Sequence, residues 1–189
     1  MSAQPSATLA GLEPSLPSSW YSSAAIFALE KERIFCREWV CVARAEELAG
    51  PGAHRVLDVL GESIILTRNR EGQLRAFYNV CRHRGARLCR EAAAGGAPLG
   101  GGLVGTRITC PYHQWTYDLD GRLIAAPHLS AVAGFDKGMF SLYPVGVECH
   151  QGFVFLNLTP AQAPSLTEQL GAISERIRRY GLGELRIGH

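Results

Sequence analysis

The sequence contains no apolar run that approaches the 18 or so residues needed to cross a membrane. Its first 20 residues, MSAQPSATLAGLEPSLPSSW, hold neither a basic segment nor a long apolar segment, so they are not typical of a secretory signal. Neither sign of charge is in large excess: the net charge is +2 and the pI is about 8.3, which argues against nucleic-acid binding. We therefore expect a cytoplasmic protein without nucleic-acid or membrane partners.

Cysteine occurs at six positions, outside the secretory context in which disulfide frameworks form. These residues are better interpreted as thiols or metal ligands. A chain of 189 residues is also long enough to bury a core without disulfides, and suits one domain with additional terminal segments.

Short runs of β-forming residues, separated by glycine, asparagine and aspartate turn signals, fill the middle of the chain. We expect strands at 39–43, 54–60, 62–68, 74–80, 107–110, 115–119, 122–126, 145–150 and 152–158. Strands of this length and spacing predict a mainly β fold, an antiparallel β sandwich or small barrel.

Helical periodicity flanks the β region on both sides. One helix is expected from Ser22 onward, with Ser22 or Ser23 as its cap, and another at 165–180, ended by Gly181 and Gly183. The closing LRIGH reads as the start of a strand. This organisation predicts a flexible tail (1–19), a helical segment (20–38), a β domain (39–160), and a helix that leads into a further domain (161–189).

Two short loops each carry one cysteine and one histidine: Cys81 and His83 in CRHRG, Cys110 and His113 in CPYHQW. Each loop directly follows an expected strand. Two thiolates and two imidazoles form a four-ligand metal set, and zinc is one candidate. Zinc fingers usually pair cysteine with cysteine and histidine with histidine, whereas here each loop supplies one of each. This interleaving favours a two-iron cluster in which one iron takes both cysteines and the other both histidines, the Rieske arrangement.

The run CRHRG…CPYHQWTYDLDG resembles the Rieske domain of ring-hydroxylating, or Rieske non-haem iron, oxygenases in their large (α) subunits. The resemblance covers roughly residues 20–189 and extends to subunits that act on quaternary amines or aromatic acids. It implies a Rieske 2Fe-2S cluster held by Cys81, His83, Cys110 and His113. It also implies electron relay from a reductase or ferredoxin to a mononuclear non-haem Fe(II), for O₂-dependent hydroxylation or demethylation in a homotrimer.

Two features distinguish the sequence within this resemblance. High-potential Rieske proteins carry an extra disulfide-forming cysteine in each loop, where this sequence has Ala86 and Tyr112, so a low-potential cluster is expected. The Gly/Ala-rich stretch 91–102 between the loops is interpreted as a flexible surface insertion.

The residues around the loops allow more than one interpretation. The arginines near the first loop form either a solvated basic face or a docking patch for an acidic electron donor: Arg82, Arg84, Arg87 and Arg90. Three aromatic residues are expected to pack around the cluster, where a hydroxyl that donates to a sulfur would tune the potential: Tyr112, Trp115 and Tyr117. The remaining cysteines are expected to be buried thiols, and three histidines to have ordinary roles: Cys36, Cys41, Cys89, Cys149, His54, His128 and His150.

A second metal site of two histidines and one carboxylate, which the resemblance requires for oxygen activation, is not recognisable after the two loops. The 189 residues are therefore interpreted as the electron-relay part of an oxygenase whose catalytic iron lies in a missing domain. A free-standing Rieske ferredoxin-like carrier is the alternative.

Overall fold

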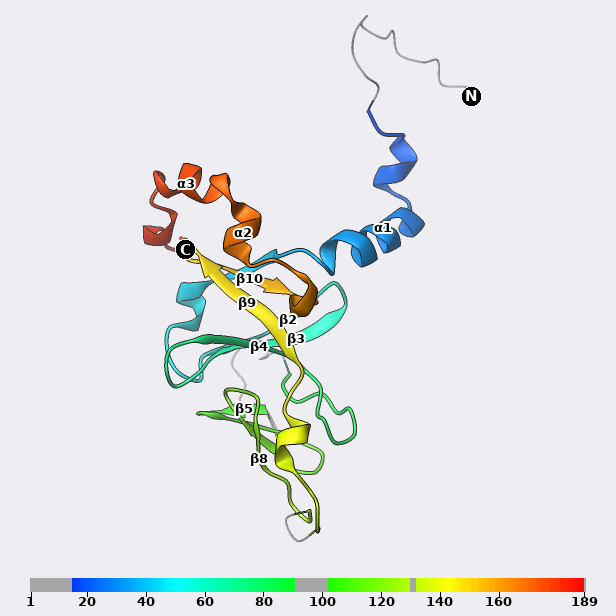
Figure 1. Cartoon of the computed structure of the whole chain (residues 1–189), viewed down its shortest axis with the longest axis vertical. Coiled ribbons are helices and arrows are strands. Elements are labelled where there is room, and N and C mark those ends of the chain that lie inside the picture. The colour runs from blue at the N-terminus through cyan, green and yellow to red at the C-terminus, as the bar shows by residue number, and fades with distance from the viewer. Residues whose placement is uncertain (1–14, 91–101, 130–131, 189) are drawn as a thin grey trace, which may run out of the picture.

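The computed structural model of the protein describes residues 15–90, 102–129 and 132–188. Within these residues, ten strands and several short helices follow one another (Figure 1). The strands are β1 (Val40–Arg44), β2 (His54–Val59), β3 (Glu62–Arg68), β4 (Leu74–Tyr78), β5 (Gly102–Val104), β6 (Arg107–Thr109), β7 (Thr116–Asp118), β8 (Leu123–Ala125), β9 (Pro144–His150) and β10 (Phe153–Asn157). The helices are η1 (Ser18–Tyr21), α1 (Ala24–Glu30), η2 (Lys31–Phe35), η3 (Ala45–Leu48), η4 (Lys137–Phe140), η5 (Pro160–Gln162), α2 (Leu166–Leu170), α3 (Ala172–Arg178) and η6 (Leu182–Glu184).

The larger sheet has six antiparallel strands in the order β1-β10-β9-β4-β3-β2. Its two edge strands, β1 and β2, line the same groove, which shows that the sheet curls into a half-barrel. Strand β3 is buried on both faces, which explains its uninterrupted apolar run. Ile64 and Leu66 pack into the core inside the curl, whereas Ile65 packs into the core shared with the smaller sheet.

The smaller sheet, β5-β6-β7-β8, lies below the half-barrel in Figure 1 and carries the second cysteine–histidine loop between β6 and β7. Its side chains meet the larger sheet in the shared core, where Phe77 contacts the turn between β7 and β8. At that turn Gly121 has φ +80°, and a Cβ there would lie 2.5 Å from the Phe77 ring, so only glycine fits. The mainly β antiparallel fold expected from the sequence is therefore confirmed.

The sequence did not predict β5. Only Gly102 of the Gly/Ala-rich stretch belongs to it, and residues 91–101, interpreted above as an insertion, lie outside the described residues. Most of the tail expected at 1–19 also lies outside them.

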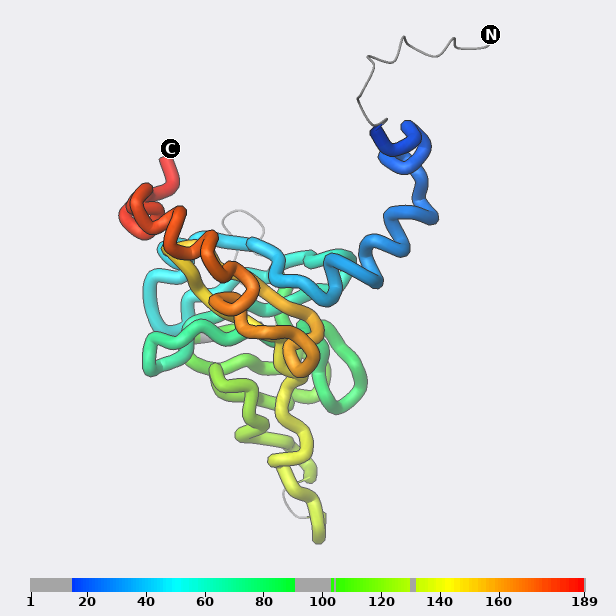
Figure 2. The backbone as a smooth tube through the Cα atoms, turned by 45° about the horizontal axis from the view of Figure 1, so that its top comes forward, coloured from blue at the N-terminus to red at the C-terminus, as the bar shows by residue number. Residues whose placement is uncertain are grey.

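The helices at the two ends of the chain agree only in part with the helices expected from the sequence. Ser23 caps α1, its hydroxyl accepting from the Ile26 N–H (3.4 Å). In Figures 1 and 2 the segment of α1 and η2 extends away from the β domain, and its apolar side chains are largely exposed. The C-terminal helix, expected as one piece at 165–180, is split by Gly171 (φ +47°) into α2 and α3.

Residues 185–188 form no strand, so the interpretation of LRIGH as a strand is wrong for the described residues. No helix in the described part of the chain is long and apolar enough to cross a membrane.

Candidate metal centre

The first loop, residues 81–85, is separated from the end of β4 by two residues and forms one tight turn. The Cys81 N–H donates to the Ala86 carbonyl (2.8 Å), and the Gly85 N–H donates back to the Cys81 carbonyl (3.0 Å). Gly85 has φ +71°, a left-handed conformation that glycine adopts at little cost. The turn holds Cys81 and His83 on a short backbone closed at both ends.

The second loop, residues 110–115, repeats the same two hydrogen bonds. The Cys110 N–H donates to the Trp115 carbonyl (2.8 Å), and the Gln114 N–H donates to the Cys110 carbonyl (3.1 Å). Gln114 occupies the position of Gly85 in the first loop and also has a positive φ of +59°, although it carries a Cβ. Two turns of the same hydrogen-bonding pattern therefore present one cysteine and one histidine each. The sequence did not reveal the left-handed backbone at Gln114.

The structure brings the four candidate residues together as two pairs. Cys81 and Cys110 are 3% and 2% exposed, and Cys81 is close enough to affect the pKa of Cys110. The His83 and His113 rings lie 4.8 Å apart between centroids, at an interplanar angle of 63°. Donors grouped in this way match two metal ions with two protein ligands each.

The electrostatics of the pairs also suit metal binding. Burial raises the pKa of the Cys110 thiol, and the neighbouring Cys81 adds to this. The buried Cys110 thiol is therefore unfavourable as a thiolate until a cation neutralises it. Burial, His113 and then Arg84 lower the pKa of His83, which favours the neutral imidazole that metals bind.

One ring nitrogen provides a direct test of whether these residues fit such a cluster. Nδ1 of His113 is buried and has no hydrogen-bond partner among the described residues. A buried polar atom without a partner costs about 1–3 kcal/mol, so its presence calls for an explanation. A metal bound at this nitrogen would supply the missing partner. Within the described residues no three His, Cys, Asp or Glu side chains gather as a single-metal site.

Trp115 connects the two loops by stacking. Its ring lies 4.8 Å from the His83 ring at 9°, and it is 2% exposed. Phe135 and Phe140 cover it edge-on at 5.9 Å and 5.5 Å. The packing predicted for Trp115 therefore exists, and it fixes the orientation of a ring that belongs to the other loop.

Tyr117 is fully buried beneath the first loop. Its hydroxyl oxygen accepts from the Arg82 N–H (3.1 Å) and lies 3.5 Å from Sγ of Cys81. Because the oxygen already accepts from Arg82, the hydroxyl proton is available to the sulfur. Tyr112, the third aromatic residue, is 61% exposed but lies against His113, with ring centroids 3.7 Å apart.

The four arginines near the first loop do not form one uniform surface. Arg82 is half-buried: its guanidinium donates to the carbonyls of Ser141 (2.6 Å) and Met139 (3.4 Å) and lies 4.0 Å from the centroid of the Tyr143 ring. The Arg82 side chain therefore holds the end of η4 and the residue after it against the first loop. The other three arginines are exposed: Arg84, Arg87 and Arg90.

All six cysteines are free. Of the four expected to be buried, Cys89 is buried, which raises the pKa of its thiol to about 11, and Cys36 is partly buried. The expectation is wrong for Cys41 and Cys149, which are exposed. Cys41 lies on edge strand β1, and Cys149 lies beyond the short stretch in which β9 pairs with β4.

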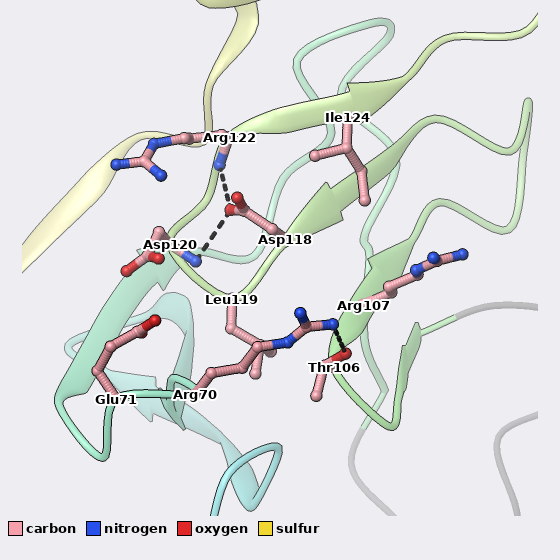
Figure 3. Close-up of a pocket in the computed structure, with 9 residues that line it drawn as sticks. All are labelled: Arg70, Glu71, Thr106, Arg107, Asp118, Leu119, Asp120, Arg122 and Ile124. Atoms are coloured by element: carbon pink, nitrogen blue, oxygen red, sulfur yellow. Dashed lines mark hydrogen bonds between the residues drawn. The ribbon is translucent and has the colours of Figure 1, made fainter.

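A separate polar cavity of about 400 Å³ lies at the other end of the smaller sheet (Figure 3). In the β6–β7 register, Thr109 and Thr116 adjoin the loop, whereas Arg107 and Asp118 lie at this far end. Arginine and carboxylate side chains both line the cavity, and Asp118 accepts from the N–H groups of Asp120 and Arg122. None of the four candidate ligands lines it.

Known proteins resemble this chain over most of its length. The carnitine monooxygenase oxygenase subunit of Acinetobacter pittii (strain PHEA-2) is 41% identical over 163 residues, which are 86% of this chain and 41% of that protein. The glycine betaine monooxygenase oxygenase subunit of Chromohalobacter salexigens is 36% identical and matches 92% of this chain and 36% of its own length. This chain thus spans about two-fifths of these curated relatives.

A solved structure of a quaternary ammonium Rieske monooxygenase, described in terms of carnitine oxidation and inter-subunit electron transfer, superimposes with a TM-score of 0.74 at 40% identity. The match covers 86% of this chain and 42% of that one. The family model for the Rieske [2Fe-2S] domain matches residues 38–136, more than half of the 189, and includes both loops. With two buried thiols, two facing imidazoles and this match, the chain belongs to the Rieske [2Fe-2S] domain family.

Proposed function

We propose that Cys81 and Cys110 bind one iron of the 2Fe-2S cluster and that His83 and His113 bind the other. The observation that carries this assignment is the buried Nδ1 of His113, which has no partner among the described residues and whose ring lies 4.8 Å from that of His83. When bound, such a cluster accepts and releases one electron.

The surrounding side chains support that role. Trp115 holds the His83 ring in place and, with Phe135 and Phe140, keeps water from one side of it. We infer a potential near the lower end of the Rieske range, about −150 mV, because Ala86 and Tyr112 exclude the inter-loop disulfide of high-potential centres. A redox titration that places the potential well above zero would overturn this inference.

We further propose that the complete protein is the oxygenase subunit of a Rieske oxygenase and oxidises a quaternary ammonium compound. The identity to carnitine and glycine betaine monooxygenase oxygenase subunits supports this substrate class. A mononuclear iron that activates oxygen would be bound by residues outside the part of the chain described here. This segment then relays electrons from a reductase to that iron, and by itself should not oxidise substrate.

The proposal includes an electron donor with an acidic surface. Arg84, Arg87 and Arg90 are exposed and lie on or just after the first ligand loop, where a negative surface would be attracted. A homotrimer fits the inter-subunit electron transfer described for the solved relative. A cytoplasmic location fits six free thiols, which persist in a reducing compartment.

The first test is a measurement of iron, acid-labile sulfide and zinc in anaerobically purified protein. We expect two irons and two sulfides per chain, lost in Cys81→Ser and retained in Cys149→Ser, which alters an exposed thiol on β9. Zinc without sulfide would replace the electron-relay function with a structural metal site.

A further inference from the structure

Asn79 is a buried polar residue between the end of β4 and the first ligand, Cys81. It is 5% exposed. A buried amide must satisfy two donor and two acceptor positions, or it destabilises the fold. The hydrogen bonds of Asn79 therefore show which parts of the structure it holds together.

The Asn79 amide is saturated. Its Oδ1 accepts from the N–H groups of Leu88 (3.0 Å) and Cys89 (2.8 Å). Its Nδ2 donates to the Cys89 carbonyl (2.7 Å) and to Oγ of Ser63 on β3 (3.1 Å). With Cys89 the side chain exchanges hydrogen bonds in both directions, as two residues of an antiparallel strand pair do.

This pairing closes the base of the first ligand loop. Leu88 and Cys89 are each 2% exposed yet belong to no strand, so their peptide groups have no ladder partner. The Asn79 side chain takes the place of a neighbouring strand. Asn79 thus fixes the base of the loop, whereas the two hydrogen bonds within the turn and the contacts of Arg82 and His83 hold its tip.

We propose that Asn79 is a positioning residue for the cluster: its amide holds the loop of Cys81 and His83 at the distance from the second loop that both irons require. The proposal rests on the ligand assignment given above. It predicts that loss of the amide loosens the cluster more than it loosens the fold.

Asn157 provides a matched control for a purely structural role. It is also fully buried, its Nδ2 donates to the Arg37 carbonyl (2.7 Å), and its Oδ1 accepts from the Thr159 N–H (2.7 Å). It lies on β10 of the larger sheet, away from both ligand loops. Asn157→Ala should therefore lower stability without acting on the cluster.

The experiment compares cluster-loaded wild-type protein with Asn79→Ala and Asn157→Ala under native conditions. Iron release from dithionite-reduced protein to excess bathophenanthroline disulfonate and the EPR spectrum of the reduced cluster are measured, together with the thermal midpoint. We expect release to be about tenfold faster in Asn79→Ala, the usual scale for losing a residue that orients metal ligands, with shifted or broadened g-values. Asn157→Ala should release iron at the wild-type rate with the wild-type spectrum, despite a lowered thermal midpoint.

Equal release rates and spectra in the two variants would overturn the proposal. If Asn79→Ala fails to fold, Ser63→Ala removes only the hydroxyl that accepts from Nδ2. Release about twofold faster in Ser63→Ala would then support the proposal, and wild-type release would overturn it. Wild-type protein that lacks two irons and two sulfides would instead refute the ligand assignment itself.

Discussion

The hydroxyl of Tyr117 should raise the reduction potential of the cluster, and Tyr117→Phe isolates its contribution. The ring is fully buried, so phenylalanine fills the same space and leaves the packing of the smaller sheet in place. The substitution removes one hydrogen bond to Sγ of Cys81, at 3.5 Å, and one acceptor for the Arg82 N–H. Burial is the main reason the pKa of Tyr117 is raised, so the hydroxyl keeps its proton at neutral pH.

The size of the effect follows from the change in charge at the sulfur. Reduction adds one negative charge, and a hydrogen bond to a charged acceptor contributes about 1–1.5 kcal/mol more than one to a neutral acceptor. For a one-electron couple, 59 mV corresponds to a tenfold change, or about 1.4 kcal/mol, so losing the bond should lower the potential by about 40–65 mV. The Arg82 N–H left without its partner should also destabilise the fold by about 1–3 kcal/mol.

A spectroscopic redox titration of both proteins measures this shift. Tyr78→Phe is the matched control: Tyr78 ends β4 just before the first loop, but its hydroxyl donates to the Leu158 carbonyl (3.2 Å) and not to a residue of either ligand loop. We expect its potential to equal that of wild type. A fully loaded Tyr117→Phe protein with an unchanged or raised potential would show that the hydroxyl does not donate to the sulfur.

Three further results are expected. Arg87→Glu, on the exposed surface beside the first loop, should slow reduction by an acidic reductase about tenfold at low salt. Arg122→Glu, at the distant polar cavity, should not slow it. Equal rates in the two variants would refute the docking surface at the first loop. Hydrogen bonding from Asn69, and then a neighbouring guanidinium, lowers the pKa of Asp120, so this carboxylate stabilises the fold above about pH 4 and loses that effect as the pH falls through its folded pKa. The stability difference between wild type and Asp120→Asn in urea titrations should accordingly be largest near neutral pH, and a difference that grows in acid would contradict this account. Gln114→Gly should relieve the left-handed backbone and raise the thermal midpoint by a few degrees, whereas Gln114→Ala should not.

The strands of the larger sheet were predictable because their patterns are local. The run 62–68 has an apolar, β-branched centre and is bounded by turns, and the observed β3 has the same limits. Strand β5 was missed because it has three residues and begins with glycine, and it exists only by pairing with β6. The break between α2 and α3 was missed because the helical spacing of apolar residues continues across Gly171. The backbone of Gly171, with a positive φ, leaves the helical conformation there.

At the candidate metal centre, the proposed ligands were likewise predictable from local sequence, whereas the residues that support those ligands were not. Cys81, His83, Cys110 and His113 could be proposed as ligands from the sequence because each loop carries one cysteine close to one histidine, a spacing that predicts a donor set. The supports act across the chain: Trp115 of one loop stacks on a histidine of the other. No local pattern distinguishes such a residue from an ordinary core aromatic.

The two kinds of residue therefore differ in what their loss should reveal. Removing a ligand abolishes the cluster and gives no information on how the fold adjusts it. Removing a support, such as the Tyr117 hydroxyl or the Asn79 amide, leaves all four donors present and changes only their surroundings. The two supports act on different properties, because a hydrogen bond to a sulfur changes the potential, whereas a hydrogen bond at the base of the loop changes how firmly the donors are held. If both variants altered potential and iron release in the same proportion, this division between tuning and holding would be wrong.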